Sequence, residues 1–118
     1  MHPGARLVHV GADDVGTLTV AEFTKRFRKR VRTGELRYSH EEQLSGSSEL
    51  FGGIAHVLST DTEQVELDTA TATLRGVNSI QVLWNGSQWR VASVVWYDET
   101  ADVQIPPANL PTSKRSIR

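Results

Sequence analysis

Residues 75–99, RGVNSIQVLWNGSQWRVASVVWYDE, are the stretch that decides the fold of this 118-residue chain. Its centre, Asn85-Gly86, lies between two runs that are rich in β-branched and aromatic residues. An Asn-Gly pair in this setting favours a type I′ turn, because both central residues of that turn need a positive φ. The sequence therefore predicts a β-hairpin with a two-residue loop.

The two faces of this expected hairpin differ in character. A two-residue loop places Trp84 opposite Ser87, and three further pairs then share the core face: Val82 with Trp89, Ile80 with Val91, and Asn78 with Ser93. A slip of one residue would place apolar side chains opposite polar Gln81, so the apolar match favours this register. On the opposite, mixed face, Val77, Val94 and Trp96 gather far from the turn, where we expect an interface.

The composition is that of one soluble domain with a single core, since 38% of the residues are hydrophobic. The absence of cysteine excludes disulfides, thiolate nucleophiles and Cys-ligated metals. The four histidines show no metal-ligand spacing, and the chain has no phosphate-binding or dinucleotide fingerprint, so we expect neither a metal nor a cofactor. No apolar run is long enough to span a bilayer and no signal peptide is visible, which makes a cytoplasmic location the expectation.

Along the chain, we expect a strand over residues 7–10, a helix over 19–32, strands over 36–44 and 54–60, a loop over 45–53 and a protruding connection over 61–73. Thr19 and Glu22 have the spacing of a capping box, and Gly34 is placed to end the helix. Residues 1–105 form the expected single domain. Residues 106–118 form a basic tail with prolines, which we expect to be flexible.

The expected helix has an apolar stripe that includes Phe23 and Phe27, and a basic surface opposite that stripe. Six residues form the basic surface: Lys25, Arg26, Arg28, Lys29, Arg30 and Arg32. Such a surface can bind nucleic acid or an acidic partner, or it can simply be solvated. We expect solvation and no nucleic acid, because the surface lacks aromatic stacking residues and the net charge of the chain is −1.

The segments HPGARLVHVG, LFGGIAHVLST, residues 75–99 and IPP, in this order, resemble the nuclear-transport-factor-2-like superfamily. This superfamily includes SnoaL-like proteins and ketosteroid isomerases, and the resemblance covers most of residues 2–107. It implies an α+β fold of the cystatin-like cone or half-barrel type. In such a fold a strongly curved antiparallel sheet packs on one main helix, a ligand cavity lies at the wide end, and dimers often form through the sheet.

The chain departs from that family before its first strand. Family members usually carry two helices there, which cover part of the concave face, whereas only six residues precede Leu7. Leaving several large side chains exposed would forfeit roughly 1.5–3 kcal/mol each, against a total stability of about 5–15 kcal/mol. We therefore expect a homodimer or higher self-association that buries the concave face, as well as or instead of the usual contact through the sheet.

Three residues are candidates for acid–base chemistry. His40 and Glu42 share one face of a strand, where a carboxylate could polarise the imidazole into a general base near neutral pH. The alternative is that both side chains are merely solvated on an outer face. His56 is the second candidate base, although a hydrogen-bonded histidine within the sheet is the preferred interpretation.

Five residues are candidates for lining a ligand cavity: Tyr38, Asn78, Trp89, Ser93 and Tyr97. Asn78 and Ser93 are expected to form a polar cross-strand pair on an apolar face, where they either bond each other or orient a ligand. The acid and tyrosine set of ketosteroid isomerases cannot be matched onto this chain. We therefore favour a non-catalytic module that binds an apolar small molecule or associates with itself. The alternative is a small lyase or isomerase that acts on an apolar carbonyl compound with a His general base.

Overall fold

The computed structural model describes residues 1–111, except for the side chains of Arg37 and Tyr38. The described elements are six strands, one α-helix and one 3-10 helix. In chain order they are β1 (Arg6–Val10), β2 (Val15–Thr19), α1 (Val20–Arg32), β3 (Leu36–Phe51), β4 (Ile54–Leu67), β5 (Thr71–Trp84), β6 (Trp89–Asp98) and the 3-10 helix η1 (Pro107–Asn109). No helix in this part of the chain is long and apolar enough to cross a membrane.

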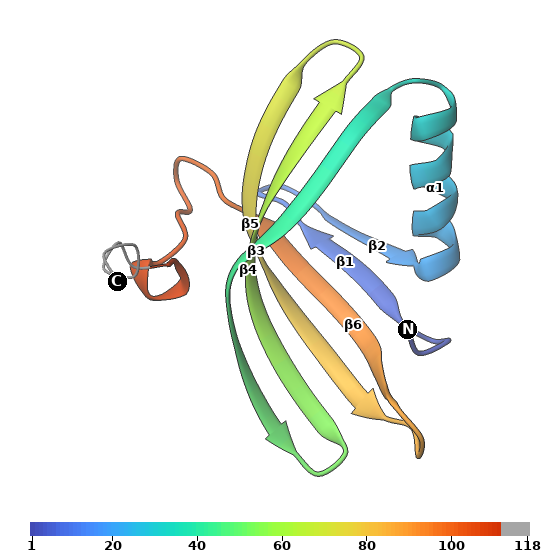
Figure 1. The fold of residues 1–118 in the computed structure, drawn as a ribbon, viewed down its shortest axis with the longest axis vertical. Helices are drawn as coiled ribbons and strands as arrows, with labels where there is room; N and C mark the ends of the chain where they lie inside the picture. Colours follow the sequence, from blue (N-terminus) through green and yellow to red (C-terminus); the bar gives the residue numbers. More distant parts are fainter. Residues whose placement is uncertain (112–118) are drawn as a thin grey trace.

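The six strands form one sheet in the order β2-β1-β6-β5-β4-β3. The sheet is strongly curved, with α1 on its concave side and the C-terminal segment on its convex side (Figure 1). The α+β fold expected from the sequence is confirmed. The sheet is mixed rather than fully antiparallel, because β1 runs parallel to β6. Nothing in the local sequence of β1 specifies the direction of a partner more than 80 residues away.

Helix α1 begins and ends where its local sequence requires. The Thr19 hydroxyl accepts a hydrogen bond from the Glu22 backbone N–H (3.1 Å), and the Glu22 carboxylate accepts one from the Thr19 N–H (2.9 Å), so the predicted capping box is present. Gly34 follows the last turn with a φ of +80°, a backbone conformation that favours glycine. The helix prediction is therefore confirmed at both ends.

Strands β3 and β4 are longer than the sequence pattern indicates. The expected loop over residues 45–53 is wrong, because β3 continues to Phe51 and the turn occupies only Gly52 and Gly53. The expected connection over residues 61–73 is also strand, interrupted only by a turn at residues 68–70. A β-bulge between Gln43 and Ser45 lets this polar, serine-rich segment stay paired along β4. The hairpin of β1 and β2 closes over residues 11–14, where the Gly11 N–H donates to the Asp14 carbonyl (2.8 Å), and the sequence pattern did not indicate β2.

The β5–β6 hairpin exists, but its register differs from the expected one. The Asn85 side-chain oxygen accepts hydrogen bonds from the backbone N–H groups of Ser87 and Gln88 (both 3.0 Å), which closes a four-residue loop over residues 85–88. Trp84 therefore pairs with Trp89. A bulge beside Val82 shifts the register once more, so that the expected pairing of Asn78 with Ser93 is wrong.

The register divides the side chains between the two faces. Asn78 now pairs with Trp96, and Ile80 with Val94, on the concave face that carries all three tryptophans. Val77 pairs with Tyr97 on the convex face. The three residues expected to form one apolar interface patch, Val77, Val94 and Trp96, thus do not share a face, because the bulge reverses the alternation in half of β6.

The C-terminal segment covers the centre of the convex face. Ile105 is buried, and its backbone N–H donates to a carboxylate oxygen of Glu99 (2.8 Å). The Ser45 hydroxyl donates to the carbonyl of Asn109, and Thr60 beneath this segment is only 2% exposed. Residues 105–110 therefore pack on the sheet. The flexibility expected for the tail stays a prediction, and residues 112–118 lie outside the described part.

The hydrophobic core is small. Among the described residues, only Ala5, Leu7, Leu36 and Ile105 are buried hydrophobic side chains. Helix α1 buries none of its residues, and Phe27, on its apolar stripe, is 42% exposed. The chain therefore folds into a curved sheet whose concave side is only partly covered by its own helix.

Candidate functional site

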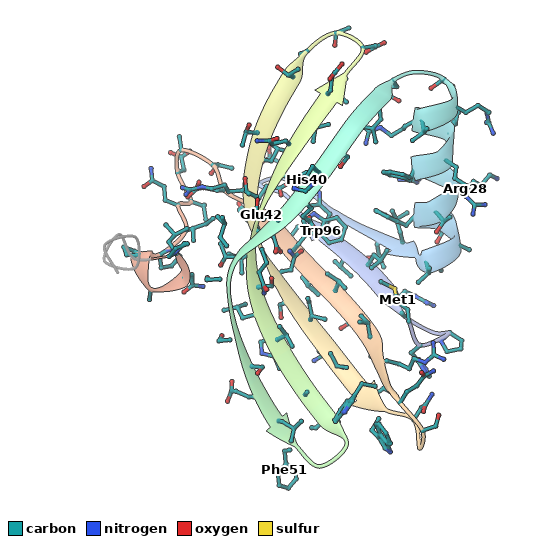
Figure 2. The ribbon with its side chains drawn as sticks, in the orientation of Figure 1. Met1, Arg28, His40, Glu42, Phe51 and Trp96 are labelled. Atoms are coloured by element: carbon teal, nitrogen blue, oxygen red, sulfur yellow. The ribbon has the colours of Figure 1, made fainter. Side chains whose placement is uncertain are left out.

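The candidate site is a band of polar side chains across the middle of the concave face. It follows two adjacent rows of the sheet. One row runs His9, Trp96, Asn78 and Ser59, and the other runs Asp98, Gly76, Asp61 and Gln43. Figure 2 labels Trp96 between the sheet and α1. We call these eight residues the concave polar band.

A histidine and a carboxylate are paired at the β1–β6 end of the band. His9 Nε2 lies 3.0 Å from Asp98 Oδ2, and the imidazole stacks on the Trp96 ring with a centroid separation of 5.2 Å. Both side chains of the pair are a little over 40% exposed, so solvent or a ligand can reach them. Because Asp98 occupies Nε2, the other ring nitrogen of His9 is available for a further contact.

Asp61 lies at the opposite end of the band and accepts two side-chain hydrogen bonds there. Its Oδ1 accepts a hydrogen bond from the Ser59 hydroxyl (3.0 Å), and its Oδ2 accepts one from the Asn78 amide. Gln43 in turn donates to Ser59 Oγ (2.9 Å). The Asn78 amide thus bonds to Asp61 on β4, and not to Ser93 on β6, which was its expected partner. The network fixes Asp61 as an acceptor with little freedom to move.

Gly76 separates the two ends of the band. It is the register partner of both Asp98 and Asp61, whose Cα atoms are therefore about 10 Å apart across the sheet. A Cβ at position 76 would lie only 2.9 Å from the Tyr97 carbonyl oxygen and 3.0 Å from Asp98 Oδ1. The glycine thereby leaves a gap between the His9–Asp98 pair and the Asp61 network.

An acidic row borders the band on the same face. Glu41 pairs with Glu63, and Glu41 lies two residues before Gln43 on β3, so Glu41, Asp61 and Glu63 share this side. Partial burial, together with the nearby Asp61 and Glu63 charges, raises the pKa of the Glu41 carboxyl. We call these three residues the acidic row. Within the described residues, no group of His, Asp or Glu side chains is arranged to hold a metal ion.

The acid–base candidates from the sequence lie on the other face. His40 and Glu42 pair with Gln64 and Thr62, alternate with the acidic row, and are both exposed. Thr62 in turn pairs with Arg75, which is held on the convex side by an ion pair with Glu99 (2.7 Å). His40 and Glu42 therefore line no enclosed pocket.

His56 also lies on the convex face. Its Nε2 is 2.8 Å from the Ser79 hydroxyl, and the side chain is half-buried. The five candidate ligand residues are split by the corrected register: Asn78 and Trp89 lie on the concave face, whereas Ser93 and Tyr97 lie on the convex one. Ser93 donates a hydrogen bond to Gln81 (3.1 Å). The side chain of Tyr38 lies outside the described residues.

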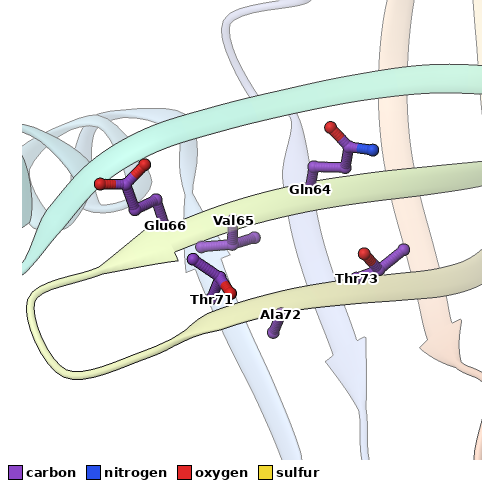
Figure 3. A pocket seen from close by; sticks show the side chains of 6 residues that line it. All are labelled: Gln64, Val65, Glu66, Thr71, Ala72 and Thr73. Carbon is purple, nitrogen blue, oxygen red and sulfur yellow. The ribbon is translucent and has the colours of Figure 1, made fainter.

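Two depressions occur away from the concave polar band. One lies at the tip of the β4–β5 hairpin, where Gln64, Val65, Glu66, Thr71, Ala72 and Thr73 surround it (Figure 3). The other lies between the C-terminal segment and the sheet, near Arg75, Glu99 and Ile105. Neither contains a pair of groups suited to acid–base chemistry, because the charged residues that line them are a lone Glu66 in the first and the Arg75–Glu99 ion pair in the second.

Sequence reasoning missed His9, Asp98, Asp61, Gln43 and Ser59. The alternation in LVHV did place Leu7 and His9 on one face, so His9 could have been assigned to the core side of β1. Its carboxylate partner could not, because the parallel β1–β6 pairing joins residues 89 positions apart. The Asp61 network depends on strand pairing in residues 61–67, whose composition is typical of a connection.

Solved structures with the same fold include proteins of several descriptions. The Kfla4162 protein from Kribbella flavida is 13% identical, with a TM-score of 0.63, over 84% of this chain and 75% of that one. The beta subunit of the benzoate 1,2-dioxygenase from Burkholderia mallei is 12% identical, with a TM-score of 0.61, over 92% and 78%. A candidate dehydratase of the NTF2-like family from Streptomyces avermitilis is 12% identical, with a TM-score of 0.60, over 81% and 67%.

These likenesses establish the architecture. The chain has the nuclear-transport-factor-2-like (NTF2-like) fold, as its sequence resemblance implied. No protein-family model matches the sequence, and no curated protein matches it either. Identities of 12–13% carry the fold and nothing about activity.

Proposed function

We propose that this chain works as a self-associating, non-catalytic module whose concave face is completed by a second copy. The observation that carries this proposal is the amount of surface that one chain leaves exposed. A compact monomer of 13.1 kDa exposes about 6,400 Å², whereas this chain exposes 8621 Å². Its radius of gyration is 16.1 Å, against about 13.5 Å for a compact domain of this length.

The excess surface has the size of a permanent protein interface. Obligate homodimers bury about 2,000–5,000 Å² in total, or about 1,000–2,500 Å² from each subunit. The excess over the compact monomer is about 2,200 Å² per chain by the same scaling. A second copy can therefore return the exposed surface to an ordinary value without any other partner.

The exposed surface is also apolar where the second copy would bind. Phe23, Phe27, Trp84 and Trp89 are each more than 40% exposed, and Leu50 at the end of β3 is 68% exposed. Apolar surface of this kind is normally removed from water by a partner. The concave polar band would then lie inside the dimer, where an apolar molecule with one polar group could contact Trp96 and the free nitrogen of His9.

Native mass spectrometry tests this proposal, because it reports the subunit number and any retained small molecule together. The expected result is a dimer at micromolar concentration that persists at moderate ionic strength. A monomer of 13.1 kDa under the same conditions would contradict the proposal. Retained mass beyond the two chains would identify a ligand for the enclosed space.

A second candidate function is proton transfer on an apolar carbonyl compound, and the His9–Asp98 pair is the observation that favours it. Asp98 at 3.0 Å fixes the imidazole through Nε2 and leaves the second nitrogen as a general base. The candidate dehydratase with the same fold makes such chemistry a reasonable test. NMR detection of deuterium exchange next to the carbonyl of simple apolar ketones would support it if His9→Gln abolished the exchange. Equal rates with and without the protein would exclude it for these ketones.

A further inference from the structure

Charge is strongly segregated along this nearly neutral chain. Six Lys and Arg residues lie within residues 25–32, and the only acidic residue of α1 is Glu22 in its first turn. Residues 38–74 contain seven Asp and Glu residues and no Lys or Arg. The overall charge of −1 therefore conceals a basic helix and an acidic arm formed by β3 and β4.

The basic surface of α1 faces solvent. Arg28, labelled in Figure 2, points away from the sheet, and the Lys and Arg residues of the helix are all exposed. Within the described residues, Arg30 forms the single salt bridge of this surface, with Glu35 at 3.6 Å. One chain thus leaves most of the helix charge without a protein counter-ion.

The carboxylates of the acidic row also lack a salt-bridge partner within the described residues. Glu41, Asp61 and Glu63 share the concave face, and the salt bridges recorded for the described residues join other groups: His9 with Asp98, Arg30 with Glu35, and Arg75 with Glu99. The pKa of Glu41 is raised because the carboxyl is partly buried beside the other two charges. A cationic partner at this row would therefore relieve a repulsion that the single chain contains.

We propose that the outer basic face of α1 in one copy docks against the acidic row on the concave face of a second copy. The inference rests on the proposed self-association and names the surfaces that carry it. Two-fold symmetry makes the contact reciprocal, because the helix of each copy meets the acidic row of the other. The same arrangement turns the two concave faces toward each other, so the apolar side chains between them leave water together.

Charge-reversal variants test the contact, with sedimentation velocity as the readout. Lys25→Glu with Arg28→Glu reverses two outward charges in the middle of α1, and Glu41→Lys with Glu63→Lys reverses two of the three charges of the acidic row. Each variant alone is expected to dimerise on the order of 100-fold more weakly than the wild-type chain, because like charges then meet. A 1:1 mixture of the two variants is expected to restore the dimer as a heterodimer.

A matched control separates a specific contact from net charge. Glu49→Lys with Glu66→Lys produces the same net charge as the acidic-row variant, but both positions lie on the convex face by register. The control variant keeps both contact surfaces, so it is expected to dimerise with itself like the wild-type chain and to leave the helix variant monomeric at the concentration that restores the specific heterodimer. Far-UV circular dichroism of each variant verifies that the fold is retained.

The possible failures are distinguishable. A wild-type monomer would overturn both the self-association and this contact. A wild-type dimer whose affinity none of the reversals changes would leave the self-association standing and overturn the contact. Equal restoration by the control mixture would also overturn it. A monomer that binds a DNA duplex through α1, with binding lost in Lys25→Glu with Arg28→Glu, would assign the basic face to a nucleic acid instead.

Discussion

The convex and concave faces of the same sheet are completed in different ways. On the convex face, the chain supplies its own cover: Ile105 is 8% exposed, Thr60 is 2% exposed, and Arg75 is paired with Glu99. On the concave face, helix α1 buries no residue, and Phe27 and Trp84 are more than 40% exposed. The chain thus covers the centre of the convex face itself, although Phe51 and Ile54 at the end of the β3–β4 hairpin stay exposed on that face, whereas the concave face has the surface of an interface.

The difference shows where the free energy of folding of a single chain is concentrated. Packing of the C-terminal segment removes an isoleucine and a threonine from water on the convex side, while the exposed apolar groups on the concave side, such as Phe27 and Trp84, contribute little until something covers them. Substitutions on the convex face should therefore change the stability of each chain. Substitutions on the concave face should change association.

The largest effect on association is expected for Phe27→Ser. Fully burying a phenylalanine contributes about 1.5–3 kcal/mol, and 42% of Phe27 is still exposed in one chain, so a symmetric dimer, which loses the remaining contribution twice, should have a dissociation constant about 10- to 70-fold higher. Sedimentation equilibrium measures the change. Val103→Ser, at an exposed position near the C-terminal segment, is the control and should leave association unaltered. If Phe27→Ser dimerised as tightly as the wild-type chain, α1 would not belong to the interface.

The next effect belongs to the convex face. Ile105→Ala should lower the free energy of unfolding by about 2–5 kcal/mol, because it deletes a buried side chain and leaves a cavity beneath the C-terminal segment. Urea denaturation at a fixed protein concentration measures it. Val103→Ala, where the side chain is 48% exposed, should cost far less. Equal losses at the two positions would mean that the segment does not pack on the sheet.

The cap of helix α1 is expected to have a smaller effect. Thr19→Ala removes the hydroxyl that accepts from the Glu22 N–H and should cost about 0.5–2 kcal/mol in unfolding free energy. Thr24→Ala, inside the same helix, is the control and should be neutral or slightly stabilising, because alanine has the higher helix propensity. Thermal unfolding of the two variants side by side decides whether the capping box contributes to stability.

The smallest effect is a contrast between two glutamates in their response to pH. A hydrogen bond from the Ile105 N–H, together with the Arg75 charge, lowers the pKa of Glu99, so its stabilisation is present above the ordinary pKa of a glutamate and disappears as the pH falls through the lowered value. The pKa of Glu41 is raised, mainly by burial, so its ionisation destabilises the fold as the pH rises through that raised value.

Two variants that replace a glutamate with uncharged glutamine measure this contrast, at a protein concentration low enough to keep the chain monomeric. Glu99→Gln should be less stable than the wild-type chain at neutral pH, with the difference shrinking below about pH 4. Glu41→Gln should be slightly more stable at neutral pH, and that advantage should vanish in acid. If both variants responded to pH with the same sign, the assignment of one carboxylate to a paired site and the other to a repulsive site would be wrong.

Local signals predicted the helix well and the sheet only in part. The capping box of Thr19 and Glu22 and the helix end at Gly34 depend on a few neighbouring residues, so they can be predicted from the sequence. The hairpin at residues 75–99 could be predicted for the same reason. Its register was not, because the Asn85 side chain closes a longer loop and a bulge at the strand centre reverses the alternation.

The site depended on information that lies far apart in the sequence. Residues 45–53 and 61–73 are polar and rich in serine, threonine or acid, which resembles loop composition, and only pairing along β4 makes them strand. The concave polar band joins side chains from β1, β3, β4, β5 and β6. His40 and Glu42 were visible as a local pair, but the register places them on the opposite face from the band. The prediction that the concave face is open depended on the family resemblance and not on any local pattern.

The three tryptophans allow one direct measurement of what covers the concave face. Trp84, Trp89 and Trp96 all lie there, so acrylamide quenching of tryptophan fluorescence reports the accessibility of that face alone. Quenching should fall as the protein concentration rises through the dimer dissociation constant found by sedimentation. Quenching that stays constant while the molecular mass doubles would show that the second copy binds elsewhere and does not cover the concave face.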